Sequence, residues 1–158
     1  MKKILFVWPQ IDDDGGGEFA LVNLVHHLRQ YFSIDILCYQ QIYKQPLPDD
    51  VGIFFAAEPN QTRIGKIINK FKLLIKLFML IKRYDLLIIN DVPFINLIVW
   101  FVTRLIKSKY IIWAHSCRSE MRPCNNKIIS IMYKKSLFAA NDIICVSNYR
   151  SEEHTSEL

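Results

Sequence analysis

The first 28 residues, MKKILFVWPQIDDDGGGEFALVNLVHHL (Met1–Leu28), contain the pattern that decides the fold. An apolar run from Ile4 to Trp8 has the length and continuity of a strand that is covered on both faces. After a loop with three glycines, apolar residues recur at helical spacing from Leu21 to Leu28, which predicts an amphipathic helix. A strand, a glycine-containing loop and a helix in this order indicate the first unit of a parallel α/β sheet.

The rest of the chain continues this alternation. Runs of strand length lie at residues 33–39, 51–57, 85–91, 109–116 and 142–148, and helical patterns cover 62–83, 93–106 and 126–138. Strands that alternate with helices predict a doubly wound parallel sheet of the Rossmann-like α/β class, with right-handed crossovers. Ligands of such sheets bind beyond the carboxyl ends of the strands. We therefore expect functional residues in the loops 9–18, 91–94, 115–123 and from 147 onward.

Composition and charge limit the class of protein. The 158-residue chain is 51% hydrophobic and 22% charged, with a net charge of +5, which indicates one globular domain. The four cysteines form no CxxC pair and no histidine pair has ligand spacing, so we expect no metal site and reduced thiols of a cytoplasmic protein. The N-terminal apolar run is too short for a secretory signal. The longest apolar stretch, at about residues 92–103, falls short of the roughly 20 residues that span a bilayer.

The glycine loop is the first candidate site. Gly15, Gly16 and Gly17 stand directly before a predicted helix, and Glu18 falls in its first turn. Glycine lets a backbone approach a ligand closely, and the free N–H groups of a helix start favour an anion such as a diphosphate. A flexible turn is the alternative, since the stretch is neither a GxGxxG nor a Walker motif. The acids at 12–14 would repel an anion, so they fit acceptor hydroxyls or solvent better.

His115 is the second candidate, because it ends the strand predicted at residues 109–116. A histidine there can hydrogen-bond a sugar hydroxyl or a phosphate, and its pKa suits proton transfer. Ser116 and Arg118 follow on the same loop, where they add hydrogen-bond donors for an anionic group. The alternative is a structural histidine at a strand end.

The long helix predicted at 62–83 carries lysines and no acid. We expect one apolar stripe to face the sheet, namely Ile64, Ile67, Ile68, Phe71, Leu74, Ile75 and Phe78. Three leucines then lie on the opposite side among lysines, and this set predicts contact with an anionic membrane surface: Lys66, Lys70, Lys72, Leu73, Lys76, Leu77 and Leu80. The alternatives are a helix covered by further protein or a merely basic exterior. Nucleic acid is not an expected partner, because no stacking aromatics interleave with the lysines.

The last nine residues, RSEEHTSEL (Arg150–Leu158), differ from the rest of the chain. They match, letter for letter, the reading-frame translation of a common DNA-sequencing adapter. We therefore expect a native domain at residues 1–149 that continues in a longer protein, and a non-native tail at 150–158. The alternative is a native helix start with Ser147 as its N-cap.

Taken together, these segments resemble the N-terminal domain of the family 4 glycosyltransferases, which have the GT-B fold. GGGEFALVNLVHHL (15–28) is similar to the family's G-G-A-E-x-x-x-x-x-L-A-x-x-L opening, with Gly17 in place of the usual Ala. YDLLIIND resembles the strand that ends near the acceptor site at Asp91, and IIWAHS resembles the T-x-H strand end at His115. NDIICVSNY resembles the strand that ends the first half, with Ser147 on its usual Ser. The likeness covers residues 1–149.

The resemblance implies transfer of a sugar from a nucleotide-sugar donor to a glycan or lipid-linked acceptor, with retention of stereochemistry. It implies that Gly15 and Gly16 approach the donor diphosphate, and that His115 contacts the reacting sugar or the acceptor. The nucleotide-sugar is a co-substrate, and no cofactor or metal is implied, because protein groups stabilise the leaving diphosphate. The location implied is cytoplasmic, peripheral on the inner face of the cell membrane.

The chain departs from the family in one large respect. Most of the family's donor site lies in its second half, which includes a Glu-x7-Glu pair, and no pair of glutamates here has that spacing. We therefore expect the 158-residue chain to have no transferase activity and to bind nucleotide-sugar weakly or not at all. The alternative function is that of a stand-alone, non-catalytic α/β binding or regulatory domain.

Overall fold

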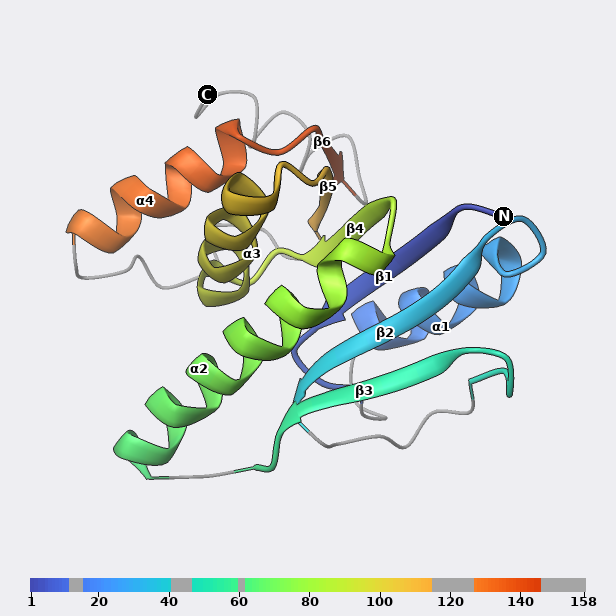
Figure 1. The fold of residues 1–158 in the computed structure, drawn as a ribbon, viewed down its shortest axis with the longest axis horizontal. Helices are drawn as coiled ribbons and strands as arrows, with labels where there is room; N and C mark the ends of the chain where they lie inside the picture. Colours follow the sequence, from blue (N-terminus) through green and yellow to red (C-terminus); the bar gives the residue numbers. More distant parts are fainter. Residues whose placement is uncertain (12–15, 41–46, 60–61, 115–126, 146–158) are drawn as a thin grey trace.

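The predicted doubly wound α/β sheet is confirmed by the computed structural model, which describes residues 1–11, 16–40, 47–59, 62–114 and 127–145. The strands are β1 (Lys3–Trp8), β2 (Ser33–Gln40), β3 (Gly52–Ala57), β4 (Leu86–Asn90), β5 (Tyr110–Ala114) and β6 (Asp142–Cys145). The helices are α1 (Gly16–Leu28), α2 (Arg63–Leu80), the 3-10 turn η1 (Ile81–Arg83), α3 (Pro93–Ile106) and α4 (Lys127–Phe138). The strands form one parallel sheet in the order β3-β2-β1-β4-β5-β6 (Figure 1).

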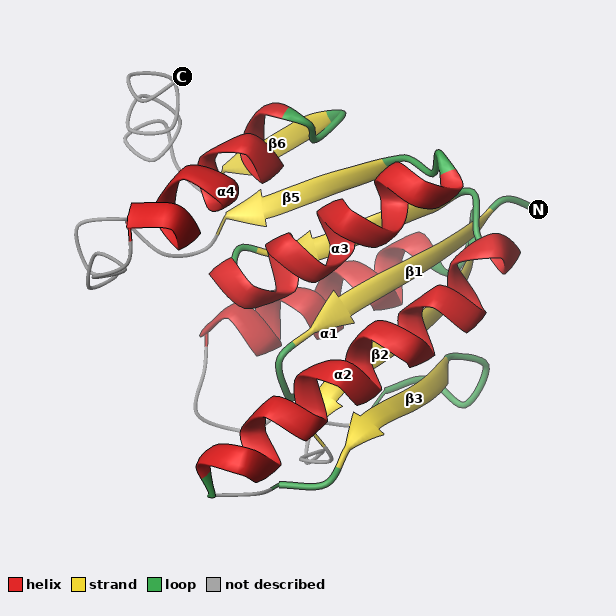
Figure 2. Cartoon of the chain, turned by 60° about the vertical axis from the view of Figure 1, so that its left-hand side comes forward, coloured by secondary structure: helices red, strands yellow, loops and turns green. Residues whose placement is uncertain are grey.

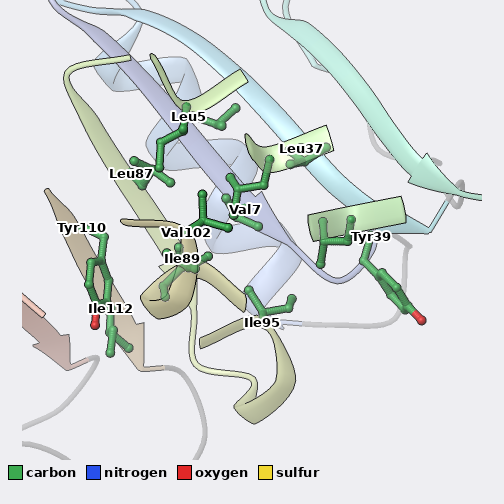
Figure 3. Packing of buried hydrophobic residues seen from close by; sticks show 14 of the residues in the cluster. Leu5, Val7, Leu37, Tyr39, Leu87, Ile89, Ile95, Val102, Tyr110 and Ile112 are labelled. Atoms are coloured by element: carbon green, nitrogen blue, oxygen red, sulfur yellow. The ribbon is translucent and has the colours of Figure 1, made fainter. Parts of the chain in front are cut away.

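Helices cover both faces of the sheet, which explains why β1 is apolar from Ile4 to Trp8. In Figure 2, α1 lies behind the strands while α2, α3 and α4 lie in front of them. Leu5 and Val7 pack into the core beneath α2, α3 and α4, where Figure 3 shows them among residues of neighbouring elements. Ile4, Phe6 and Trp8 pack into the second core, beneath α1. A central strand between two helix layers has no solvent-facing side, so alternation of polar and apolar residues is absent.

Local sequence signals fix the ends of the helices. The Oγ1 of Thr62 accepts a 3.0 Å hydrogen bond from the backbone N–H of Gly65, which caps the start of α2. Pro93 stands in the first turn of α3, where its missing N–H removes no helical bond. Lys107 ends α3 in the left-handed conformation, with φ of 60°, and its N–H donates to the carbonyl of Thr103.

The orientation of α2 differs from the predicted one. Leu73, Leu77 and Leu80 are buried in the core, so the prediction that they contact a membrane is wrong. The stripe that was predicted to face the sheet is instead largely on the outside, with Ile64, Ile67, Ile68, Phe71, Ile75 and Phe78 exposed.

Two further residues of α2 lie on its buried side. Gly65 and Asn69 lie in line with Leu73 on the buried side, and Asn69 Nδ2 donates a 2.7 Å hydrogen bond to the Glu58 carbonyl just beyond β3. The buried amide of Asn69 is thus paired, so a polar residue on the inward side of α2 carries no unsatisfied donor at this bond. Among the helices that the structure describes, none is long and apolar enough to cross a bilayer.

Candidate functional site at the carboxyl ends of β1 and β4

The strand order reverses between β1 and β4. The chain leaves β1 toward β2 on one side and reaches β4 on the other. The helix that follows β1 is α1 on one face, whereas the helix that follows β4 is α3 on the opposite face (Figure 2). Open parallel sheets bind ligands at this switch point, outside the carboxyl ends of the strands. The starts of α1 and α3 therefore define the candidate site.

Gly16 opens α1 at this site. Gly16 is exposed, and a Cβ atom added to it would meet no atom within 4 Å. None of the glycines that the structure describes has a positive φ, so the backbone at Gly16 does not require glycine. The N–H groups at the start of a helix have no partner within the helix, so they can bind an anion. A glycine that the fold itself does not need leaves space for a ligand to come close to the backbone.

Gly17 and Glu18 follow in the first turn of α1, where both are partly exposed. The Glu18 carboxylate lies near the positive end of the helix dipole, which stabilises the helix start. The structure thus brings Gly16, Gly17 and Glu18 to the predicted edge of the sheet.

Asp91 follows β4 directly and is buried, with 1% of its surface exposed. Its Oδ1 accepts a 2.7 Å hydrogen bond from Asn96 Nδ2 on α3 and a 2.6 Å hydrogen bond from the Tyr133 hydroxyl on α4. Its backbone N–H donates to the Trp113 carbonyl of β5, at 3.2 Å. Asp91 therefore joins four elements at the edge where it was predicted, within a buried polar cluster.

Asn96 and Tyr133 also belong to this cluster, and neither was predicted from the sequence. Asn96 is a single polar residue inside the apolar run of α3, and that interruption is the signal that could have found it. Its Oδ1 accepts no hydrogen bond from the described residues. Tyr133 lies 42 positions from Asp91 in the sequence, and no local pattern links the two.

An apolar groove of about 550 Å³ lies beside the same edge, between α2, α3 and α4. It begins at Pro93 and Phe94, which open α3, and it reaches Phe71 and Leu74 on α2. Among the lining residues that the structure describes, Lys70 alone is charged, and its Nζ lies 5.4 Å from the centroid of the Phe94 ring. The groove is therefore suited to an apolar ligand with a negative charge at its rim.

Several predicted site residues lie outside the described part of the chain, namely Gly15, His115, Ser116, Arg118 and Ser147. Within the described part, no three His, Cys, Asp or Glu side chains stand close enough to hold a metal ion. Burial raises the pKa of the Cys38 thiol to about 12, so this thiol stays protonated near neutral pH and is a poor nucleophile.

Comparison with known proteins shows which solved structures have a similar fold. No family model and no curated protein matches the chain. Among solved structures, it is similar to the lipopolysaccharide outer core galactosyltransferase WaaB, with a TM-score of 0.68 and 15% identity over 98% of this chain. The chain has the fold of one half of a GT-B protein.

Two further likenesses agree with that fold. A UDP-glucosyltransferase from Polygonum tinctorium matches with a TM-score of 0.61 and 14% identity over 92% of this chain. The UDP-GlcNAc 2-epimerase from Methanocaldococcus jannaschii matches with a TM-score of 0.60 and 14% identity over 99% of this chain. The chain spans 42% of WaaB, 46% of the glucosyltransferase and 42% of the epimerase.

Proposed function

We propose that this chain is the acceptor-side half of a glycosyltransferase that moves a sugar from a nucleotide-sugar to a glycan or lipid-linked acceptor. The observation that carries the proposal is the exposed start of α1 at Gly16, at the switch point of the sheet, where the fold does not require glycine. A half-length likeness to a galactosyltransferase and a glucosyltransferase supports it.

In this proposal the donor diphosphate lies against Gly15 and Gly16. The N–H groups at the start of α1 then stabilise the negative charge that grows on the leaving diphosphate, so a metal ion is not part of the proposal. His115 contacts the reacting sugar or the acceptor, and Ser116, Arg118 and Ser147 add hydrogen bonds around them. Transfer with retention is proposed from the family resemblance.

Asp91 has a more specific role in the proposal than simple contact with substrate. Its carboxyl is engaged by Asn96 and Tyr133, so it holds the start of α3 and the end of β4 in place. We propose that Asp91 is a positioning residue of the acceptor side, and that the acceptor meets the backbone and side chains around the start of α3.

In this proposal a second half supplies most of the donor site, because the chain spans only 42% of WaaB and 46% of the glucosyltransferase. The proposed location is the cytoplasm, at the inner face of the cell membrane. The gene read from an intact genome across codon 150 tests this arrangement. We expect a frame that continues into a second half, and a genuine stop after Leu158 would instead support a stand-alone binding or regulatory domain.

A nucleotide-sugar epimerase is the second candidate, because the epimerase from Methanocaldococcus jannaschii matches nearly the whole chain. The two functions differ in their need for an acceptor. An epimerase changes the sugar of its nucleotide-sugar with no acceptor present, whereas a transferase forms a new glycoside. Proton NMR of the product from the longer protein, with and without acceptor glycan or lipid, separates them.

A further inference from the structure

The charged side chains of α2, η1, α3 and α4 are all lysines and arginines, so this helix layer carries positive charge only. Eleven of the twenty Lys and Arg residues lie in these elements, and all fifteen Asp and Glu lie elsewhere in the chain. The three helices lie together on one side of the sheet (Figures 1 and 2). This side therefore presents a cationic surface, although the whole chain carries only a modest net charge of +5.

The outer face of α2 is also apolar. Six bulky side chains are between 45% and 73% exposed, and we call them the outer stripe: Ile64, Ile67, Ile68, Phe71, Ile75 and Phe78. They lie on the side of the helix opposite to Leu73 and Leu77, which are fully buried. Such a continuous exposed apolar row is unusual in water and marks an interaction surface.

Lysines border the outer stripe. Lys70 Nζ lies 5.4 Å from the centroid of the Phe94 ring, and Lys76 Nζ lies 5.8 Å from that of the Phe54 ring, so both ammonium groups lie beside the helix. Lys72 is exposed on the same helix, next to Phe71. Apolar side chains in the centre with ammonium groups beside them suit the boundary between acyl chains and lipid phosphates.

The apolar groove continues this surface. Phe71 belongs both to the outer stripe and to the groove lining. In the described part of the chain, the groove lining is apolar apart from Lys70. An acyl chain or the apolar part of a lipid thus has a place next to the outer stripe.

We propose that the outer stripe and its flanking lysines lie on an anionic lipid bilayer. Charge decides between a bilayer and a second copy of the chain. Two copies that met through this face would bring lysines against lysines, with no acid on α2 to pair with them. An anionic bilayer supplies the missing negative charge and covers the apolar side chains as well. This surface is independent of the sugar-transfer chemistry, so vesicle binding tests it separately.

Vesicle flotation with the 158-residue chain tests the proposal. The probes are vesicles of phosphatidylglycerol and phosphatidylcholine in equal amounts, and vesicles of phosphatidylcholine alone. We expect the chain to float with the anionic vesicles only. The combined variant Ile67→Gln, Phe71→Gln, Ile75→Gln should lower the partition coefficient at least about tenfold, since it removes three apolar contacts. Lys72→Gln should lower it about fivefold at low salt.

The matched control changes apolar residues on the other face of the sheet. Phe19 and Tyr31 are 61% and 68% exposed on the α1 side, and the variant Phe19→Gln, Tyr31→Gln should float as the unchanged chain does. Circular dichroism confirms that each variant is folded. A folded chain that binds no anionic vesicle, or that floats equally well with the outer stripe replaced, overturns the proposal. So does a dimer in light scattering that the same three substitutions abolish while vesicle binding is absent.

Discussion

The hydroxyl of Tyr133 on α4 donates a 2.6 Å hydrogen bond to Oδ1 of Asp91 at the end of β4. Both residues are buried, so removal of the hydroxyl leaves a buried carboxyl oxygen with one partner fewer. Tyr133→Phe should therefore lower the free energy of unfolding by about 1–3 kcal/mol, measured by urea denaturation. Tyr31→Phe, at an exposed tyrosine, is the matched control and should change it by less than about 0.5 kcal/mol. Equal effects of the two substitutions would contradict the role of the Tyr133 hydroxyl.

Because of the orientation of α2, alanine substitutions at two nearby residues should differ in their effect on the free energy of unfolding. Leu77 is fully buried and Ile75 is 56% exposed. Leu77→Ala should cost about 2–5 kcal/mol of unfolding free energy, because it leaves a cavity in the core. Ile75→Ala should change the unfolding free energy by no more than about 0.5 kcal/mol. A larger loss for Ile75→Ala than for Leu77→Ala would mean that α2 faces the sheet with its other stripe.

Gly16 allows stability to be separated from function. A methyl group at this position meets open space, and alanine is the better helix former, so Gly16→Ala should leave the unfolding free energy unchanged or raise it by up to about 1 kcal/mol. The variant's thermal denaturation curve measures this. A marked loss of stability would show that the glycine serves the fold and would remove the main argument for a ligand there.

Because the Cys38 thiol is buried, we expect the free energy of unfolding to decline at alkaline pH. Burial raises the pKa of its thiol from 9.0 to about 12. A thiol with a higher pKa in the folded state stabilises that state fully below its unfolded pKa, and the contribution is lost as the pH rises from 9.0 toward 12. Burial raises the pKa of the Tyr84 and Tyr110 hydroxyls too, which acts in the same direction.

The unfolding free energy of the unchanged chain should thus fall over this alkaline range. Cys38→Ala removes the thiol's share, so its curve of unfolding free energy against pH should be less steep between about pH 9 and 11. Urea denaturation at a series of pH values measures both curves. Parallel curves for the two proteins would show that the buried thiol makes no such contribution.

Most of the fold could be predicted because its signals are local. The apolar run of β1 and the helical spacing from Leu21 to Leu28 depend on residues close in sequence, and both elements are confirmed. The predicted end of the strand at residues 85–91 also indicated the edge of the sheet at which Asp91 lies. Its partners Asn96 and Tyr133 could not be assigned in the same way, because their contact depends on how α3 and α4 pack.

The inward face of α2 could not be decided from hydrophobicity. The outer stripe is the longer apolar row, whereas the inward row contains Asn69 beside its leucines, so periodicity alone favours the wrong face. The choice depends on the contacts that bury Gly65 and Asn69 and on the shape of the core that receives Leu73 and Leu77. These are tertiary constraints, and a count of apolar positions does not contain them.

Nucleotide release by the longer protein is the most direct test of the proposed transferase half. The protein encoded by the intact gene is mixed with a panel of nucleotide-sugars and with glycan or lipid-linked acceptors, and the free nucleoside diphosphate is measured. We predict acceptor-dependent release from at least one donor. Gly16→Ala should lower this rate about tenfold to a hundredfold, because its methyl group takes space that the donor needs, while the protein stays folded. Release that is unchanged in Gly16→Ala, or no release from any donor, would contradict the account.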